Sequence, residues 1–388
     1  MRLLHTSDWH LGRSFHREGM LGPQAAFVDW LLDVVRAERV DAVIVAGDLY
    51  DRALPPVDAV ALCDEALRRL AAAGVPTVVI SGNHDSARRL GFGADLIDAA
   101  GVHLRTDPVR VGEPVLLADR HGPVAVYAVP YLEPEAVRAC LGCDERSHDA
   151  VLSAAATRVR RDLATRRAGT RSVLVAHATV VGGERCDSER DTSVGGAEAV
   201  PLSTFAGVDY VALGHLHGAQ RVGDGVHYSG SPLAYSFSEA RHGKSVTLVD
   251  LGPRGVERVE RLPCPVPRPL ARLRGRLADL LADPALAAHE GAWVQAVLTD
   301  AERPRDAMQR LRARFPHTLV LQLEPEGGPA RDERSYAARL RGRDDLEVAE
   351  GFLEHVRGRA ADDAERTVLR TAMEAVRRSG EELVGAGR

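Results

Sequence analysis

The sequence has 388 residues, of which 45% are hydrophobic and 27% are charged. This composition is typical of a globular protein and excludes a wholly disordered chain. The length predicts about two or three domains. The formal net charge of −5 excludes a uniformly basic protein of the histone type, although it leaves room for a local basic surface.

Neither secretion nor membrane insertion is indicated. The first apolar residues, Met1–His5, are too few for the core of a signal peptide and run directly into polar residues. No apolar stretch approaches the roughly 20 residues that span a bilayer. Five cysteines in so long a chain form no disulfide framework, and Cys140 and Cys143 are interpreted as two incidental thiols. We therefore expect a soluble cytoplasmic protein with no membrane partner.

Up to about residue 264, short apolar runs alternate with helical patterns, which predicts a layered α/β domain. The strand candidates are bounded by Gly, Asp or Asn, as strands buried on both faces are. They are Arg2–His5, Asp41–Ala46, Thr77–Ile80, Val124–Pro130, Ser172–Ala176, Tyr210–Leu213, Val226–Ser229 and Ser245–Leu251. The helix candidates are Gln24–Arg39, Pro56–Ala73, Ala87–Ala100 and Ala150–Ala168.

Two linkers divide the rest of the chain. Four prolines within residues 262–269 predict an extended linker, because proline continues neither a ladder nor a helix interior. The predicted small α+β domain, 270–325, has the elements Leu270–Ala282 (helix), Ala292–Leu298 (strand), Arg305–Phe315 (helix) and Thr318–Leu323 (strand). After a second linker, the tail 345–380 is predicted to be helical. Its apolar stripes are Val348, Phe352 and Val356, and then Val368, Ala372, Met373 and Val376.

Metal-type side chains follow five of the predicted strands directly. They are Asp8 with His10, Asp48 with Asp51, Asn83 with His84, His177, and His215 with His217. Because ligands bind outside the carboxyl ends of strands in α/β sheets, we expect these groups to meet at one rim. Each motif alone is equally explained by a turn or a surface pair. Five in order, each after a strand, favour a metal centre.

The residue types indicate the chemistry. Carboxylate, amide and imidazole without thiolate suit Mn²⁺, Mg²⁺, Fe or Zn²⁺ rather than a closed structural zinc site. One carboxylate can bridge two ions, and Asp48 is the candidate. Two ions roughly 3.5–4 Å apart activate a water and clamp both oxygens of an in-line displacement. His84 is placed to protonate the leaving oxygen.

This ordered set of motifs resembles the calcineurin-like metallophosphoesterase superfamily over roughly residues 1–250. Within it, the chain is similar to the SbcD family of bacterial nuclease subunits. The segments that carry this similarity are His5–Gly12, Gly47–Arg52, Ser81–Ser86, Tyr228–Pro232, Ser236–Glu239 and Lys244–Ser245. The resemblance implies a four-layer α-β-β-α sandwich over residues 1–262, a small α+β domain capping the DNA, and a helical C-terminal tail that binds a partner.

The resemblance also implies roles for the site residues. One ion would be held by Asp8, His10, Asp48 and His217, and the other by Asp48, Asn83, His177 and His215, with His84 as the acid. Two divalent ions per chain are expected, with Mn²⁺ preferred and Mg²⁺ possible. Archaeal relatives have a histidine where this chain has Asp51, which we interpret as a structural partner of Arg52.

A DNA nuclease is the activity that the resemblance implies, as an exonuclease on duplex ends and an endonuclease on single strands and hairpins. It would act in DNA repair, recombination and replication with an SbcC-like SMC-type ATPase, as a homodimer within a heterotetramer at the nucleoid. Since this chain has no G-x-x-x-x-G-K-[ST] loop, ATP use is expected in that partner. The tail stripes would dock on the partner or pack on their own domain. Helices Pro56–Ala73 and Ala87–Ala100 are candidates for the dimer face.

Residues 265–316 hold nine arginines against six acidic residues, so the basic excess falls on the predicted cap. The candidate DNA contacts are Arg272, Arg274, Arg276, Arg310, Arg312 and Arg314, for which a solvated helix face is the alternative. A metallophosphatase or cyclic-nucleotide phosphodiesterase would share every ligand, so it is the alternative activity. A non-catalytic DNA-binding scaffold is less compatible with a complete ligand set.

Overall fold

The computed structural model describes residues 1–190, 199–326, 344–357 and 359–373. The chain forms two compact units, Met1–Glu326 and Gly327–Arg388. In the first unit, two six-stranded sheets form the centre of the predicted α/β domain, and a three-stranded sheet forms the small domain that follows it.

The first large sheet has the strand order β14-β13-β1-β4-β5-β6. Its strands are β1 (Arg2–Thr6), β4 (Ala42–Ala46), β5 (Thr77–Ile80), β6 (Val102–Arg105), β13 (Ser245–Gly252) and β14 (Gly255–Pro263). β1, β4, β5 and β6 run parallel, and β13 joins β1 antiparallel. The parallel strands therefore end at the same edge.

The second large sheet has the order β11-β12-β10-β9-β8-β7. Its strands are β7 (Val115–Asp119), β8 (Gly122–Ala128), β9 (Arg171–His177), β10 (Tyr210–Gly214), β11 (Gln220–Gly223) and β12 (Val226–Tyr228). β8, β9, β10 and β12 are parallel, so this sheet also presents one edge of carboxyl ends.

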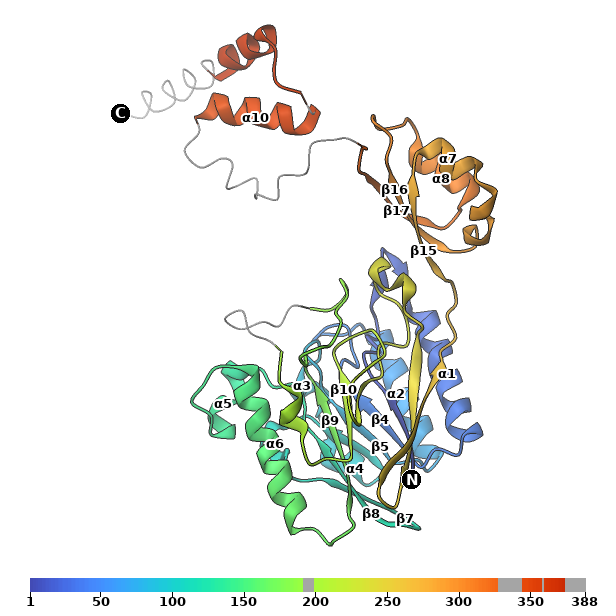
Figure 1. The fold of residues 1–388 in the computed structure, drawn as a ribbon, viewed down its shortest axis with the longest axis vertical. Helices are drawn as coiled ribbons and strands as arrows, with labels where there is room; N and C mark the ends of the chain where they lie inside the picture. The colour runs from blue at the N-terminus through green and yellow to red at the C-terminus, as the bar shows by residue number, and fades with distance from the viewer. Residues whose placement is uncertain (191–198, 327–343, 358, 374–388) are drawn as a thin grey trace. The chain divides into compact units, whose positions relative to one another are not determined.

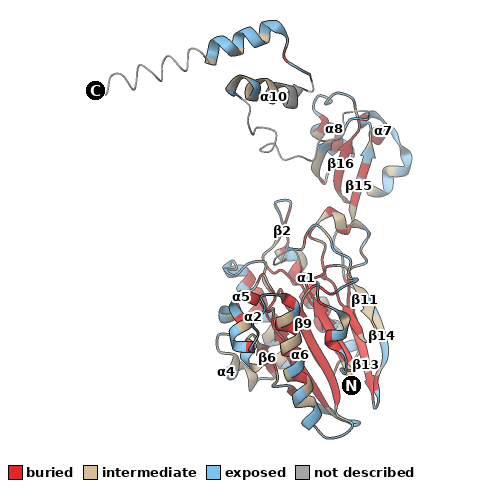
Figure 2. Cartoon of the chain, turned by 60° about the vertical axis from the view of Figure 1, so that its left-hand side comes forward, coloured by how far each residue is buried: buried red, intermediate tan, exposed pale blue. Residues whose placement is uncertain are grey.

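Helices cover the outer faces of the two sheets (Figure 1). α1 (Leu21–Ala37) and α2 (Val57–Ala72) pack on the first sheet, and α5 (Pro134–Leu141) and α6 (His148–Thr165) pack on the second. A third core, with Ile44, Val126 and Val175, fills the space between the sheets. Figure 2 shows the buried strands in red and the exposed helix faces in pale blue. The expected four-layer α-β-β-α sandwich is confirmed.

Short elements connect these layers. They are β2 (Ser14–Phe15), β3 (Glu18–Gly19), α3 (Ala87–Leu90), α4 (Ala94–Asp98) and the 3₁₀ helices η1 (Pro108–Arg110), η2 (Leu202–Phe205) and η3 (Phe237–Arg241). The prediction of one helix over Ala87–Ala100 is wrong. Gly93 adopts a left-handed φ of 72°, which interrupts the helix and leaves α3 and α4 as separate turns.

The small domain holds three parallel strands with helices between them. They are β15 (Leu270–Gly275), α7 (Leu277–Ala282), η4 (Pro284–His289), β16 (Trp293–Leu298), α8 (Ala307–Arg314) and β17 (Thr318–Leu323). The predicted helix Leu270–Ala282 is wrong over its first half. Ala271 and Leu273 are buried while Arg272 and Arg274 are exposed, which is the period of a strand, and this strand pairs with β16.

An apolar joint connects the small domain with the sandwich. Phe15 and Phe237 of the sandwich pack with Trp293 and Leu270 of the small domain, and the rings of Phe15 and Trp293 are 5.2 Å apart. Burial of large aromatic side chains makes such a contact stable.

The second unit contains α10 (Asp345–Arg357) and a helix over 363–373. The predicted tail 345–380 is helical in these two segments, and its last part, 374–380, lies outside the described residues, as do the side chains of Val356 and Val376. Phe352 and Val368 are exposed. Among the helices that the structure describes, none is long and apolar enough to cross a bilayer.

Candidate metal centre

The loops at the carboxyl ends of five strands meet at one rim of the sandwich. β1 leads to Asp8 and His10, β4 to Asp48, β5 to Asn83 and His84, and β10 to His215 and His217, while β9 ends at His177. All are buried except the half-buried Asn83. The two sheets contribute to the same place because their parallel strands end at the same rim.

The backbone that presents these side chains is strained. Asp8, His10, Asp48 and His215 have φ values of 55°, 46°, 50° and 101°, a region that residues other than glycine rarely adopt. Each such residue costs on the order of 1–3 kcal/mol and persists only where its surroundings hold it. Here the amides of Asp8 and His10 donate to the carbonyls of Gly47 and Asp48, both at 3.0 Å.

Two glycines allow the loops to approach one another. A Cβ on Gly82 would lie 2.2 Å from Asp48 Oδ1, and a Cβ on Gly214 would lie 1.9 Å from the carbonyl oxygen of Ala46. Any side chain at either position would therefore displace a strand end of the site.

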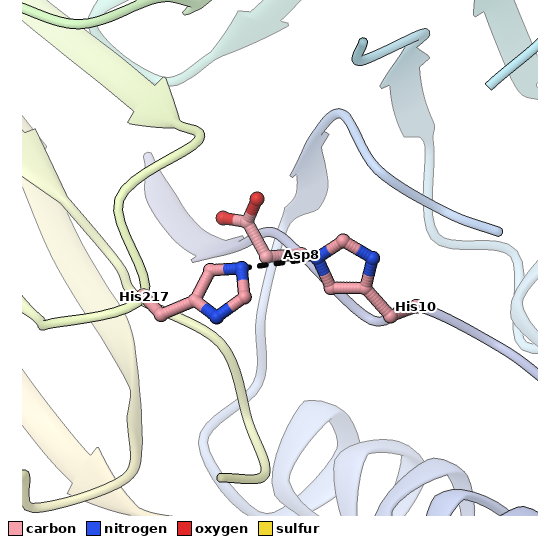
Figure 3. A group of neighbouring side chains, drawn as sticks. All are labelled: Asp8, His10 and His217. Carbon is pink, nitrogen blue, oxygen red and sulfur yellow. Dashed lines mark hydrogen bonds between the residues drawn. The ribbon is translucent and has the colours of Figure 1, made fainter. Parts of the chain in front are cut away.

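Asp8, His10 and His217 form a first group of candidate ligands (Figure 3). The Nε2 atoms of His10 and His217 are 3.0 Å apart. His217 Nδ1 lies 2.7 Å from Ser188 Oγ, and Ser188 donates to Glu239 over 2.7 Å. Because the Ser188 hydroxyl donates its hydrogen to Glu239, it can only accept a hydrogen bond from His217. His217 Nδ1 therefore carries the hydrogen, and the lone pair on Nε2 faces the group.

Asn83, His177 and His215 form a second group around the carboxylate of Asp48. Asn83 Oδ1 is 2.9 Å from His177 Nε2 and 3.1 Å from His215 Nδ1, and His177 Nε2 is 3.4 Å from Asp48 Oδ2. Ligand atoms about 2.1 Å from one ion lie roughly 3.0–3.4 Å from one another. His177 Nδ1 donates to the carbonyl of Ala46 over 2.8 Å, so its Nε2 faces the group.

Asp48 lies between the two groups. Its Oδ2 is 3.7 Å from His10 Nε2 on one side and 3.4 Å from His177 Nε2 on the other. This is the position that a bridging carboxylate requires. The structure thus brings all seven predicted ligands together, and their binding of metal stays a prediction.

The electrostatics of the pocket favour an added positive charge. Burial and the neighbouring Asp48 raise the pKa of Asp8 to about 8. Burial opposes protonation of His177, yet the attraction of Asp48 raises its pKa to about 9. Burial lowers the pKa of His217 to about 4, which keeps this imidazole neutral, as a ligand must be. A divalent cation would be stabilised in such a site, because the site contains more carboxylate groups than permanently charged cationic side chains.

His84 lies against the ligands, in a group of candidate metal ligands with His10 and Asp48, and its role as the acid stays a prediction. Its Nδ1 lies 2.7 Å from the backbone carbonyl of Asp51, to which it donates. Its Nε2 is 4.0 Å from Asp48 Oδ2 and therefore faces the site. The interpretation of Asp51 as a structural partner of Arg52 is incomplete. Besides that pair at 3.6 Å, its carboxylate lies 3.8 Å from His10 Nδ1.

A set of residues that support His217 was not predicted from the sequence. Glu189 accepts from the His217 amide over 2.7 Å, and Ser188 contacts the ring Nδ1 while donating its own hydrogen to Glu239. Lys244 in turn pairs with Glu239. No strand end or known metal motif precedes Ser188 and Glu189, so only the tertiary structure identifies them.

The predicted DNA-contact arginines differ in their surroundings. Arg272, Arg276 and Arg310 are exposed and have no ion-pair partner among the described residues. Arg274 pairs with Glu324. Arg312 donates to the Thr318 carbonyl over 3.1 Å, and Arg314 donates to the carbonyls of Leu280 and Asp283. The guanidinium group of Arg314 therefore forms hydrogen bonds within the small domain.

Cys140 and Cys143 are free thiols whose Sγ atoms donate to the carbonyls of Val137 and Ala150. Neither belongs to a group of candidate metal ligands in the described part of the chain. Their interpretation as incidental thiols agrees with these contacts.

Known proteins match this chain along most of its length. A calcineurin-like phosphoesterase model matches residues 1–219, and a model described as the type 5 capsule protein repressor C-terminal domain matches residues 266–357. The SbcD subunit of the SbcCD nuclease of Escherichia coli (strain K12) is 35% identical over 333 residues, which cover 81% of this chain and 82% of that protein.

Two solved structures are more distant. A dimetal phosphatase from Danio rerio is 16% identical, with a TM-score of 0.38, over 68% of this chain and 98% of that one. TT1561 of Thermus thermophilus is 15% identical, with a TM-score of 0.38, over 67% of this chain and 98% of that one. Both are much less similar in sequence to this chain than the Escherichia coli protein is.

Proposed function

The chain belongs to the calcineurin-like phosphoesterase family and is a relative of the SbcD nuclease subunit, and from this membership we propose that it is a metal-dependent DNA nuclease. It hydrolyses phosphodiester bonds at DNA ends, as an exonuclease on duplex and as an endonuclease on single strands and hairpins. The observation that carries this proposal is the 35% identity with the SbcD nuclease subunit over 81% of the chain, and the seven carboxylate, amide and imidazole side chains at one rim supply the site.

The candidate ligands form two metal-binding groups with different members. Two divalent ions in this site would lower the pKa of a water and neutralise the charge that develops on the phosphate. Asp8, His10, Asp48 and His217 would hold one ion. Asp48, Asn83, His177 and His215 would hold the other. The strained loops fix these atoms before substrate binds, so no reorganisation is needed when charge develops.

His84 supplies the proton for the leaving oxygen. Because Nδ1 donates to the Asp51 carbonyl, Nε2 is the nitrogen that exchanges a proton with the substrate. The backbone amide of His84 also donates to Asp48 Oδ1 over 2.9 Å, which ties the acid to the bridging carboxylate. We therefore assign His84 to catalysis and not to metal binding.

Mn²⁺ is the proposed ion, with Mg²⁺ as a weaker substitute. Four of the seven ligands are imidazoles, whereas Mg²⁺ prefers oxygen ligands and retains several waters. Activity restored to the metal-free protein by Mn²⁺ at lower concentration than by Mg²⁺ supports this choice. The reverse order of effectiveness contradicts it.

The small domain, 270–325, is proposed to cap the DNA. Arg272 and Arg274 alternate with buried residues along β15 and so share its exposed face. Arg276 and Arg310 are also exposed. Contacts of this kind bind the phosphate backbone without regard to sequence and weaken as salt is added. Arg272, Arg276 and Arg310, which have no internal ion pair among the described residues, are the main candidates.

The proposed partners are an SbcC-like SMC-type ATPase and a second copy of this chain in a heterotetramer at the nucleoid. Large apolar side chains are exposed just before and at the start of α2, with Leu54 at 64% and Val57 at 82%, and in the α3–α4 segment, with Phe92 at 85% and Leu96 at 84%. Large apolar side chains left exposed to solvent favour an interaction surface, and we assign these to the homodimer. Phe352 and Val368 of the tail are proposed to contact the ATPase.

One experiment separates this function from its alternative. The purified chain with Mn²⁺ is incubated with end-labelled duplex, hairpin and single-stranded DNA, and separately with a cyclic nucleotide and a phosphomonoester. Cleavage of DNA supports the proposal. Turnover of the cyclic nucleotide or the phosphomonoester, with intact DNA, identifies a phosphodiesterase or phosphatase of the same family instead.

A further inference from the structure

A pocket lies beside the loop that carries His217. It has a volume of about 410 Å³ and is formed by the residues after His217, the end of η3, the start of β13 and the end of β14. Gly218 and Ala219 form one wall, and a Cβ on Gly218 would lie 3.2 Å from the His242 ring. None of the proposed metal ligands lines it.

The lining carries an excess of positive charge. Arg241 and Arg261 are exposed and have no ion-pair partner among the residues that the structure describes. Lys244, the only lysine in the sequence, also lines the pocket, but its Nζ is bound to the buried Glu239 and to the His217 carbonyl. Glu184 is the one acidic side chain of the lining. Among the described residues, the lining therefore holds two guanidinium groups without an ion pair and a single carboxylate.

Two buried polar atoms of the lining lack partners. Ser245 is 5% exposed, and its Oγ makes no hydrogen bond with the part of the chain that the structure describes. His242 Nδ1 is likewise buried without a hydrogen bond. Ser245 lies opposite Pro263 in the β13–β14 ladder, and proline has no N–H group to offer. A buried hydroxyl without a partner is unfavourable, and a phosphate oxygen in the adjoining pocket would supply the missing hydrogen bond.

We propose that this pocket binds a phosphate group, with Arg241 and Arg261 pairing with its charge and Ser245 and His242 donating hydrogen bonds. Guanidinium groups match phosphate oxygens in geometry and charge. The volume falls within the range of small-molecule sites, about 300–1,000 Å³, and exceeds what an isolated phosphate fills. The ligand is therefore a phosphate with an attached organic group. Resting on the proposed nuclease function, we take it to be a nucleotide, either free or within a DNA strand.

The test measures binding of radiolabelled deoxyadenosine monophosphate to the full-length chain by equilibrium dialysis. It is done with Mn²⁺ and again with EDTA, where the metal centre holds no phosphate. The wild-type chain is expected to keep one nucleotide site per chain in EDTA. Arg261→Gln and Ser245→Ala are each expected to weaken that site at least tenfold. Arg254→Gln, which removes an exposed arginine from the β13–β14 turn outside the pocket, is the matched control and is expected to bind normally.

Ser245→Ala separates binding from folding. Because its hydroxyl makes no internal hydrogen bond, the variant is expected to melt at or above the wild-type temperature while binding less nucleotide. Competition by orthophosphate and by a short single-stranded oligonucleotide then identifies the source. Stronger competition by the oligonucleotide indicates a DNA contact, and stronger competition by the monophosphate indicates a free nucleotide.

Two results would overturn the proposal: no nucleotide bound by the wild-type chain in EDTA, or equal binding by wild type and Arg261→Gln. Because this readout is binding without metal, it does not depend on the proposed nuclease activity. Failure of DNA cleavage would leave the result intact, and failure of binding here would leave the nuclease assignment intact.

Discussion

Replacement of His84 by glutamine tests the proposed acid directly. His84 Nδ1 is held by the Asp51 carbonyl at 2.7 Å, so Nε2 is the only ring nitrogen that can give a proton to the substrate. Glutamine can keep a hydrogen bond to that carbonyl but cannot act as an acid. A positioned acid contributes about 10²–10⁴-fold to rate, which is about 2.7–5.5 kcal/mol of barrier. We expect kcat to fall by this factor.

Metal content separates this loss from damage to the site. The bond from the His84 backbone amide to Asp48 Oδ1 does not involve the side chain, so the bridging carboxylate keeps its position in the variant. Cleavage of end-labelled duplex is measured with Mn²⁺, and bound metal is counted by mass spectrometry, with about two ions per chain expected. His103→Gln, which alters a histidine on β6 paired with Asp98, is the matched control. Wild-type cleavage by His84→Gln would falsify the assignment, and loss of bound metal would identify His84 as a ligand.

Three further changes test other parts of the structure. Ser188→Ala removes the hydrogen bond to His217 Nδ1, so the affinity for Mn²⁺ measured by metal titration is expected to fall about 10–100-fold. Unchanged affinity would contradict the role of Ser188 in orienting the His217 ring. Asp119→Asn weakens the ion pair with the buried Arg171, so the free energy of unfolding measured by urea titration is expected to fall by about 3 kcal/mol. A loss below about 1 kcal/mol would contradict the importance of this ion pair. Leu96→Glu places a charge on the proposed dimer face and is expected to yield a monomer in sedimentation analysis, while a variant that remains dimeric moves the interface elsewhere.

The sequence predicts the strand ends and their ligands well because both follow local rules. Strands such as Ala42–Ala46 are short, rich in β-branched residues and buried on both faces. The polar residues that follow such a strand are therefore recognised as lying beyond its end. Parallel strands then bring those residues to one rim whatever the details of packing. This is why seven ligand candidates from distant parts of the sequence lie together in the structure.

The failures of prediction have a different physical origin. Leu270–Gly275 has apolar and arginine side chains that fit a helix or a strand period, and its pairing with β16 decides the outcome. The edge strand β14 is largely exposed and rich in charge, so it carries no apolar signal. Ser188 reaches His217 and Glu239 across 29 and 51 residues of sequence, and no local pattern encodes such contacts.

Metal removal should reverse the pH dependence of stability. Asp8 and His177 have pKa values raised to about 8 and about 9, so the folded metal-free protein holds protons that the unfolded chain releases at lower pH. Their contribution to stability is fully present below the unfolded-state pKa of each group and is lost as the pH rises through the folded-state value. The lowered pKa of His217, about 4, acts in the opposite direction but has no further effect once the pH exceeds about 7.

Between pH 7 and 9, the melting temperature of the EDTA-treated protein is therefore expected to fall. With Mn²⁺ it is expected to hold or rise, because metal binding requires these same groups without their protons and strengthens as they are lost. Saturation at about 1,000 times the dissociation constant would add about 4 kcal/mol of stability. Asp48→Asn is the control, since loss of the bridging carboxylate should remove most of the Mn²⁺ effect. Parallel pH profiles with and without Mn²⁺ would show that these buried groups do not form the metal centre.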